Sequence, residues 1–178
     1  MSKSRLIVVV TMILAAAASR LIPHPPNVAS VTAVALFGGA YLPRKWLAFL
    51  VPVVALLLSD LIIGFYSHME SVYGSFAVVV CIGLWLRGRC RAPAIAAAAL
   101  ASSTLFFLVT NFSVWFWGSS YPRTAAGLLA CYVAAIPFFR NTLIGDALYT
   151  TVLFGGLALA EKHWPVLRES AFSRPRSF

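Results

Sequence analysis

Acidic, amide and imidazole side chains occur within or beside long apolar runs of this chain, where they are costly to bury. The clearest case is Asp60, which follows Ser59 inside the run from Trp46 to Tyr66. A carboxylate in the middle of a membrane-spanning helix costs roughly 2.5–3.5 kcal/mol to insert, so it usually faces protein or a water-filled cavity. Its chemistry there would be ligand binding, ion coupling or acid–base catalysis. Other polar candidates for one shared site lie near the ends of apolar runs: His24, Asn27, His68, Tyr73, Asn111, Arg140, Asn141 and Asp146.

The composition around these residues is that of an integral membrane protein. Of the 178 residues, 61% are hydrophobic and only 11% are charged, whereas a soluble domain carries about 25% charged residues. The net charge of +9 does not indicate a nucleic-acid partner, because the basic residues form short clusters between apolar runs. Such clusters are what the positive-inside rule expects of a membrane protein.

Six apolar runs predict an all-α fold with about six transmembrane helices in a single domain, since a span needs about 20 apolar residues. The predicted spans are 6–22, 28–42, 46–66, 72–86, 94–117 and 141–160, followed by a basic tail, 161–178. The second is short. Residues 125–139 are apolar but end at Pro137 and Arg140, which predicts a half-helix or re-entrant segment. Residues 2–18 also resemble a signal peptide, but we expect an uncleaved helix because apolar runs continue along the chain.

Charge predicts the orientation of these spans. With six spans and a cytoplasmic N-terminus, eleven of the fourteen lysines and arginines lie inside and three lie outside, which follows the positive-inside rule. If the second apolar run does not cross the membrane, the N-terminus lies outside, with ten basic residues inside and four outside. The spans after Lys45 keep the same orientation. In the six-span arrangement every polar cluster lies on the outer side. The sequence therefore predicts a cavity open outward, in an integral membrane protein with a cytoplasmic C-terminus.

The acidic residues have structural as well as functional interpretations. Asp60 can form an ion pair with Arg140, or it can contact a ligand or a coupling ion. Asp146 lies about one helical turn beyond Arg140, so a structural pair between these two competes equally with a binding role.

The remaining candidates also have two interpretations each. His24 lies between prolines, which favour extended backbone before them, and this suits either a cavity wall or a plain loop. His68 is a ligand contact or an ordinary loop residue. Trp115 and Tyr121 form either an interfacial aromatic belt or a stacking surface for a flat ligand. Cys81 is either a small hydrophobic residue or, if a metal-containing ligand enters the cavity, the thiolate that binds it.

Several motifs resemble those of a bacterial inner-membrane family of unknown function, over nearly the whole chain. They are Arg20 to Asn27 (RLIPHPPN), Ala35 to Ala40 (ALFGGA), Ser59 to Phe65 (SDLIIGF), Val72-Tyr73, Thr110 to Phe112 (TNF), Tyr121-Pro122 and Ile136 to Thr142 (IPFFRNT). The family does not name a ligand.

The architecture also resembles the substrate-binding S components of energy-coupling-factor (ECF) vitamin transporters. The similarity lies in the chain length, the six spans, the short second span and the outward site. It implies capture of a vitamin and import driven by a separate ATPase and coupling module. One group of this kind imports cobalamin and binds its cobalt through a cysteine, a role that Cys81 or a residue near Tyr73 would take here.

The leading hypothesis is a membrane-embedded subunit that binds a small molecule, a vitamin, for uptake. His24, Asp60, Asn111 and Asn141 would contact it. The chain has no Walker A pattern or hydrolase motif, so it does not hydrolyse ATP itself, and no resident cofactor is expected. Two alternatives stay open: a membrane enzyme using Asp60 with His24 or His68 on a lipid-soluble substrate, and an assembly protein whose polar residues merely pair.

Overall fold

Residues 1–168 of the computed structural model are described, and within this part of the chain the only regular elements are helices. This confirms the all-α prediction. The predicted tail lies partly outside these residues, at positions 169–178. The elements, in order, are α1 (Lys3–Ala18), η1 (Ser19–Leu21), α2 (Val31–Tyr41), α3 (Lys45–Ile63), α4 (Met69–Trp85), α5 (Ala92–Trp117), α6 (Ala125–Thr150), η2 (Thr151–Gly155), α7 (Gly156–His163) and η3 (Pro165–Leu167).

Four helical stretches are long and apolar enough to cross a membrane: Lys3–Leu21, Lys45–Ile63, Ala92–Trp117 and Ala125–His163. They identify the chain as a membrane protein. Two apolar helices, α2 and α4, are shorter. At about 1.5 Å per residue, the 11 residues of α2 extend only about 16 Å, roughly half of a hydrocarbon core that is about 30 Å thick. The crossing of all six predicted spans therefore stays a prediction.

The short helix α2 forms the centre of the fold. Its nine residues from Thr32 to Ala40 are all buried, and it contacts α1, α3, α4, α5 and α6. The helix α1 belongs to the same core, since Val9 and Ile13 are fully buried against it. The first apolar run is thus a packed helix of the domain.

A non-helical segment, residues 22–30, leads from the end of α1 back into the molecule. Its last residue, Ser30, is fully buried and donates a hydrogen bond of 2.6 Å to the carbonyl of Ala16. The start of α2 therefore lies beside the last turn of α1. Irregular backbone at membrane depth is tolerated where it is covered by protein or lines a cavity. Helix α6 covers part of this segment, and it comes close because residue 145 is glycine. A Cβ at Gly145 would lie 3.1 Å from the Val28 Cα and the Ala29 nitrogen.

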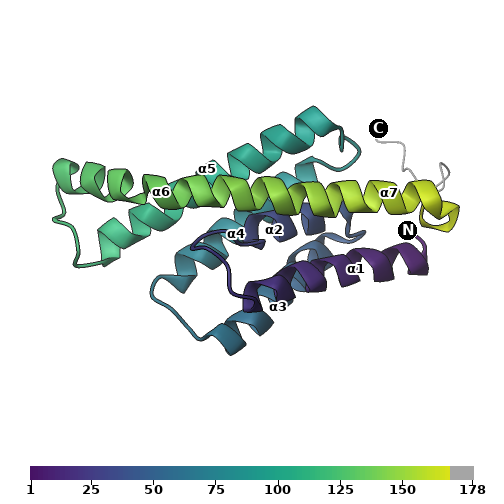
Figure 1. The fold of residues 1–178 in the computed structure, drawn as a ribbon, viewed down its shortest axis with the longest axis horizontal. Helices are drawn as coiled ribbons and strands as arrows, with labels where there is room; N and C mark the ends of the chain where they lie inside the picture. Colours follow the sequence, from purple (N-terminus) through teal and green to yellow (C-terminus); the bar gives the residue numbers. More distant parts are fainter. Residues whose placement is uncertain (169–178) are drawn as a thin grey trace.

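The helices place the basic turns at one end of the molecule, which we call the basic end (Figure 1). There Arg5 forms an ion pair with Glu161 at 2.6 Å and lies over the ring of Tyr41. Arg87, from the turn after α4, reaches the carbonyl of Leu42 at 2.6 Å. The opposite end, which we call the cavity end, contains the turns between α1 and α2, between α3 and α4, and between α5 and α6.

We expect replacement of Arg87 by glutamine to lower the free energy of unfolding by about 2 kcal/mol. Its guanidinium donates to the carbonyls of Gly39 at 2.9 Å, Leu42 at 2.6 Å and Pro43 at 3.3 Å, which α2 leaves without intrahelical donors. Denaturation of the purified protein in micelles measures the loss. The matched control is Arg89→Gln, because Arg89 is exposed and contacts the ring of Trp85. Equal losses in the two variants would contradict this role.

The prediction of a half-helix or re-entrant segment at residues 125–139 is wrong. Residues 125–139 form the first half of α6, and the helix continues through Pro137. A proline inside a helix removes one backbone hydrogen bond and strains the preceding turn. Here contacts with α5 hold this part of the helix: the rings of Phe107 and Phe139 lie 4.4 Å apart, and the Tyr132 hydroxyl donates to the Leu108 carbonyl. The π-helical turn η2 joins α6 to α7 without a break.

Candidate functional site

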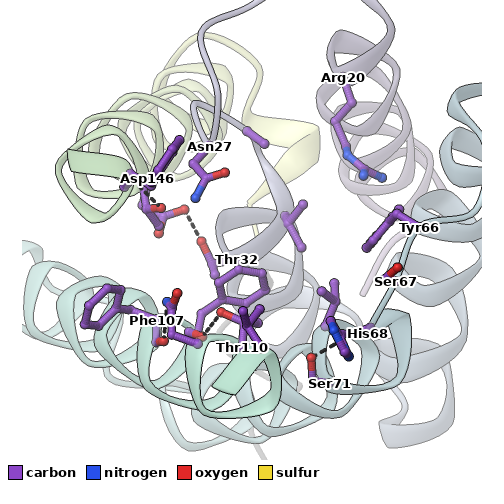
Figure 2. Close-up of a pocket in the computed structure, with 18 of the residues that line it drawn as sticks. Arg20, Asn27, Thr32, Tyr66, Ser67, His68, Ser71, Phe107, Thr110 and Asp146 are labelled. Carbon is purple, nitrogen blue, oxygen red and sulfur yellow. Dashed lines mark hydrogen bonds between the residues drawn. The ribbon is translucent and has the colours of Figure 1, made fainter. Parts of the chain in front are cut away.

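A cavity of about 520 Å³ lies at the cavity end. Figure 2 shows two polar walls across it, with Asp146 and Thr32 on one side and Arg20, Tyr66 and His68 on the other. The first wall comes from α6 and the start of α2, and the second from η1 and the turn between α3 and α4. Segments far apart in the sequence therefore meet in one place.

The first wall is built around the carboxylate of Asp146, which is 3% exposed. One of its oxygens, Oδ1, accepts a hydrogen bond from the hydroxyl of Thr32. The other, Oδ2, accepts from the hydroxyl of Ser103 on α5 at 2.6 Å. Among residues 1–168 no cation forms an ion pair with this carboxylate. The partial positive charge at the amino end of α2 lies beside it, so within the described residues the wall presents an acid without an ion-pair partner.

The second wall is built around Arg20, whose position is fixed by a buried network. Its Nη2 lies 2.8 Å from Oδ1 of Asp60, with the two side chains 11% and 0% exposed, and its Nη1 donates to Ser59. The Tyr73 hydroxyl donates to Oδ2 of Asp60 at 2.9 Å. Asp60 does have a structural ion pair, but its partner is Arg20 and not the Arg140 that the sequence suggested. Asp60 therefore orients a cavity residue and does not itself line the cavity.

The turn between α3 and α4 completes this wall with two rings. His68 has a φ of 65°, and its Nδ1 lies 3.8 Å from the exposed carboxylate of Glu70. Burial, together with the negative charge of Asp60, raises the pKa of Tyr66, which keeps its phenol a hydrogen-bond donor. His24 also lines the cavity, with Nδ1 2.7 Å from the Ile22 carbonyl.

Between the polar walls the lining is apolar and aromatic. Phe106 and Phe107 of α5 and Phe138 of α6 contribute rings, and Asn111 contributes an amide. The Asn111 amide nitrogen donates to the Phe107 carbonyl of its own helix at 2.8 Å, which leaves its oxygen as an acceptor. An apolar cavity with a few placed polar groups is the usual form of a small-molecule site.

The sequence candidates separate into two groups in space. Those that line the cavity are His24, Asn27, His68, Asn111 and Asp146. Those that do not line it have other contacts. Asn141 donates to the Pro26 carbonyl at 2.9 Å, Trp115 donates to the Pro122 carbonyl and so closes the turn that contains Tyr121, and Arg140 is exposed on α6. No ion pair joins Arg140 to Asp146 within the described residues.

Cys81 is also outside the cavity. It is exposed on α4 and lines a separate shallow groove with Trp85 and alanines of α5. No cysteine lines the cavity among residues 1–168, and no group of three or more His, Cys, Asp or Glu side chains there is arranged to hold a metal ion.

Several lining residues were not predicted. Arg20 was counted only as an outer loop charge, although it begins the RLIPHPPN motif. The hydroxyl residues carry no signal of their own in an apolar helix, since most of them bond to their own backbone. The polar lining residues that were not predicted are Arg20, Thr32, Tyr66, Ser67, Ser71 and Thr142.

Among residues 1–168 the acids near the cavity are hydrogen-bonded to groups other than histidine. Both oxygens of Asp60 are engaged, one by Arg20 and one by Tyr73. In the part of the chain that the structure describes, neither His24 nor His68 hydrogen-bonds to Asp60 or to Asp146. A general acid or base needs hydrogen-bond reach to its partner, so these contacts do not support the membrane-enzyme hypothesis.

Comparison with known proteins gives a family but no function. Neither the curated proteins nor the solved structures include a match. The model of a family of unknown function, DUF6580, matches residues 1–167, and this chain therefore belongs to that family.

Proposed function

We propose that this protein is a membrane-embedded binding component for the uptake of a small molecule of vitamin size. The observation that carries the proposal is the cavity of about 520 Å³ with two polar walls and an aromatic floor. Sites for small molecules and cofactors have volumes of about 300–1,000 Å³ and are mostly apolar with a few fixed polar groups. The described residues match that pattern without offering a catalytic pair.

The walls favour a ligand with a flat apolar part and a polar or anionic edge. Arg20 presents hydrogen-bond donors whose geometry is set by Asp60 before any ligand arrives, and such preorganisation reduces the cost of binding. Tyr66, His68 and Ser71 add polar groups beside it. The rings of Phe106 and Phe107 provide the surface on which a planar ligand would pack.

The similarity to ECF S components is part of this proposal. Its support is architectural: a short central helix, a cavity at one end and basic turns at the other. In that arrangement all six apolar helices insert in a bacterial inner membrane, the basic end and the C-terminus are cytoplasmic, and an ATPase and coupling module supplies the energy. Cobalamin is a weaker candidate than a smaller vitamin, because Cys81 is outside the cavity and the corrin ring with its side chains is bulky.

A ligand screen on the purified protein tests the proposal. Thermal stability in micelles is measured against a panel of vitamins and related anions, and a ligand at about 100 times its dissociation constant should add about 2.7 kcal/mol. We expect His68→Asn to weaken binding about tenfold, because it removes the imidazole while asparagine tolerates the left-handed backbone of this position. Arg140→Gln is the control, since Arg140 is outside the cavity.

Two results would contradict the proposal. One is a panel in which no compound changes the stability of the wild-type protein. The other is a ligand whose affinity is equal in His68→Asn and in wild type but falls in Arg140→Gln, because that ligand would bind outside the cavity.

A further inference from the structure

A second cavity lies on the other side of Asp146 and extends toward the basic end. Its volume is about 600 Å³, and it runs between α5 and the α6–α7 helix from Ser103 to Tyr41 and Cys90. Its walls are mostly apolar, with alanine, leucine, isoleucine and phenylalanine side chains. The two cavities have a single lining residue in common, Asp146, among those of the described chain.

The carboxylate of Asp146 is divided between the two cavities. Its Oδ1 accepts from Thr32, which lines the first cavity, and its Oδ2 accepts from Ser103, which lines the second. We call these three residues the septum. The septum is thin, since one carboxylate and the two hydroxyls that it accepts from are the polar groups between the two cavities. A buried carboxylate in a membrane protein that faces such spaces marks an ion or proton pathway.

A second observation points to the same place. The hydroxyl of Thr150, one helical turn beyond Asp146, is 7% exposed and lines the second cavity, yet it has no hydrogen-bond partner among the described residues. A buried, unsatisfied hydroxyl is costly, and it provides an oxygen for an incoming cation or water. The π-helical turn η2 follows immediately, and such turns are frequent at functional sites.

We propose that the septum binds a small monovalent cation, a proton or a sodium ion, which reaches Asp146 from either cavity. Neutralising this acid would let the Thr32 and Ser103 hydroxyls rotate away from it, so that the two cavities connect. The septum itself has no competing base, because α2 and α5 contribute only hydroxyls there. The titratable and charged groups that face it lie farther off, in the first cavity as Arg20, His24, Tyr66 and His68 and in the second as Tyr41 and Cys90.

This inference goes beyond the proposed uptake function and does not require its ligand. It gives the protein an ion-coupled step of its own, which a binding subunit driven only by a separate ATPase would not need. The two ideas therefore have separate tests: the ligand screen probes the first cavity, and the experiment below uses only salt and pH.

The experiment compares the wild-type protein with Asp146→Asn in micelles. Thermal stability is measured in sodium chloride against choline chloride at constant ionic strength. Infrared difference spectra follow the carbonyl stretch of a protonated carboxyl group between about pH 5 and pH 9. A sodium-dependent gain in stability that Asp146→Asn abolishes identifies sodium. A carboxyl band that titrates in this range and is missing from Asp146→Asn, without a sodium effect, identifies the proton.

Two further variants keep the inference falsifiable if Asp146→Asn does not fold. We expect Thr150→Val and Ser103→Ala each to shift the sodium midpoint or the carboxyl titration by about tenfold in cation concentration, the effect of one polar contact. The matched control is Thr104→Val, because Thr104 is exposed, bonds to its own helix and lines neither cavity. A wild-type protein that is indifferent to sodium and has no titrating carboxyl band overturns the inference, as does an equal shift in Thr104→Val.

Discussion

Alanine in place of Gly39 or Gly83 is expected to lower the free energy of unfolding by about 3 kcal/mol, at the upper end of the usual cost of overpacking. The two glycines face each other where α2 crosses α4. A Cβ on Gly39 would lie 2.4 Å from the Val80 carbonyl oxygen, and one on Gly83 would lie 2.4 Å from the Leu36 carbonyl oxygen. Both obstacles are backbone atoms, so no side chain can rotate to make room. Small residues allow such close approach in membrane proteins.

Denaturation of each variant in micelles measures this cost. The matched control is Gly74→Ala, on the same helix α4, where a Cβ would meet no atom within 4 Å. There alanine should be neutral or should stabilise the helix by up to about 1 kcal/mol. If Gly83→Ala were no less stable than Gly74→Ala, the crossing of α2 and α4 could not be as close as the structure has it.

Asparagine in place of Asp60 is expected to cost about 3–5 kcal/mol, because it leaves the guanidinium of Arg20 buried without its counter-charge. Asparagine also has one acceptor oxygen where the carboxylate has two, so it cannot accept from both Arg20 and the Tyr73 hydroxyl. Since Asp60 orients Arg20 without lining the cavity, any loss of ligand affinity should accompany the loss of stability.

A double-mutant cycle with Arg20→Gln tests the pair. The double variant Arg20→Gln/Asp60→Asn should be more stable than the sum of the single losses implies, because it no longer buries an unpaired charge. Glu70→Gln serves as the control acid, since the Glu70 side chain is 70% exposed and exposed pairs contribute about 0–1 kcal/mol. Additive losses for Arg20 and Asp60 would show that the two residues act independently.

Much of the helical architecture could be predicted from the sequence, because apolar runs of span length have few alternatives in lipid. Each of the six predicted spans overlaps a helix of the structure. The exception is the stretch before Pro137. The proline there predicted the end of a helix, but the helix continues because α5 packs against it. A proline shows that one hydrogen bond is missing, but not whether a neighbouring helix compensates for it.

The site could be predicted less completely. Of the polar candidates, five line one cavity: His24, Asn27, His68, Asn111 and Asp146. The partner of Asp60 could not be deduced, because pairing depends on how residues 22–30 return into the molecule, and this follows from packing against Ala16 and Gly145. Arg20 was therefore counted among the loop charges when it is the centre of one cavity wall.

The continuous helix Ala125–His163 has a consequence for the surrounding lipid. Its 39 residues extend about 58 Å, and apolar side chains are exposed along it from Leu129 to Leu159, a stretch of about 45 Å that the exposed Arg140 interrupts. A hydrocarbon core about 30 Å thick is too thin to cover all of that stretch on a helix that stands upright. If the turns before Arg140 also lie within the membrane, the helix tilts strongly or the bilayer thickens locally, and either response costs fractions of a kcal/mol per ångström of mismatch. Lipids with long acyl chains would relieve this mismatch, so membrane thickness itself becomes a determinant of where this protein is most stable.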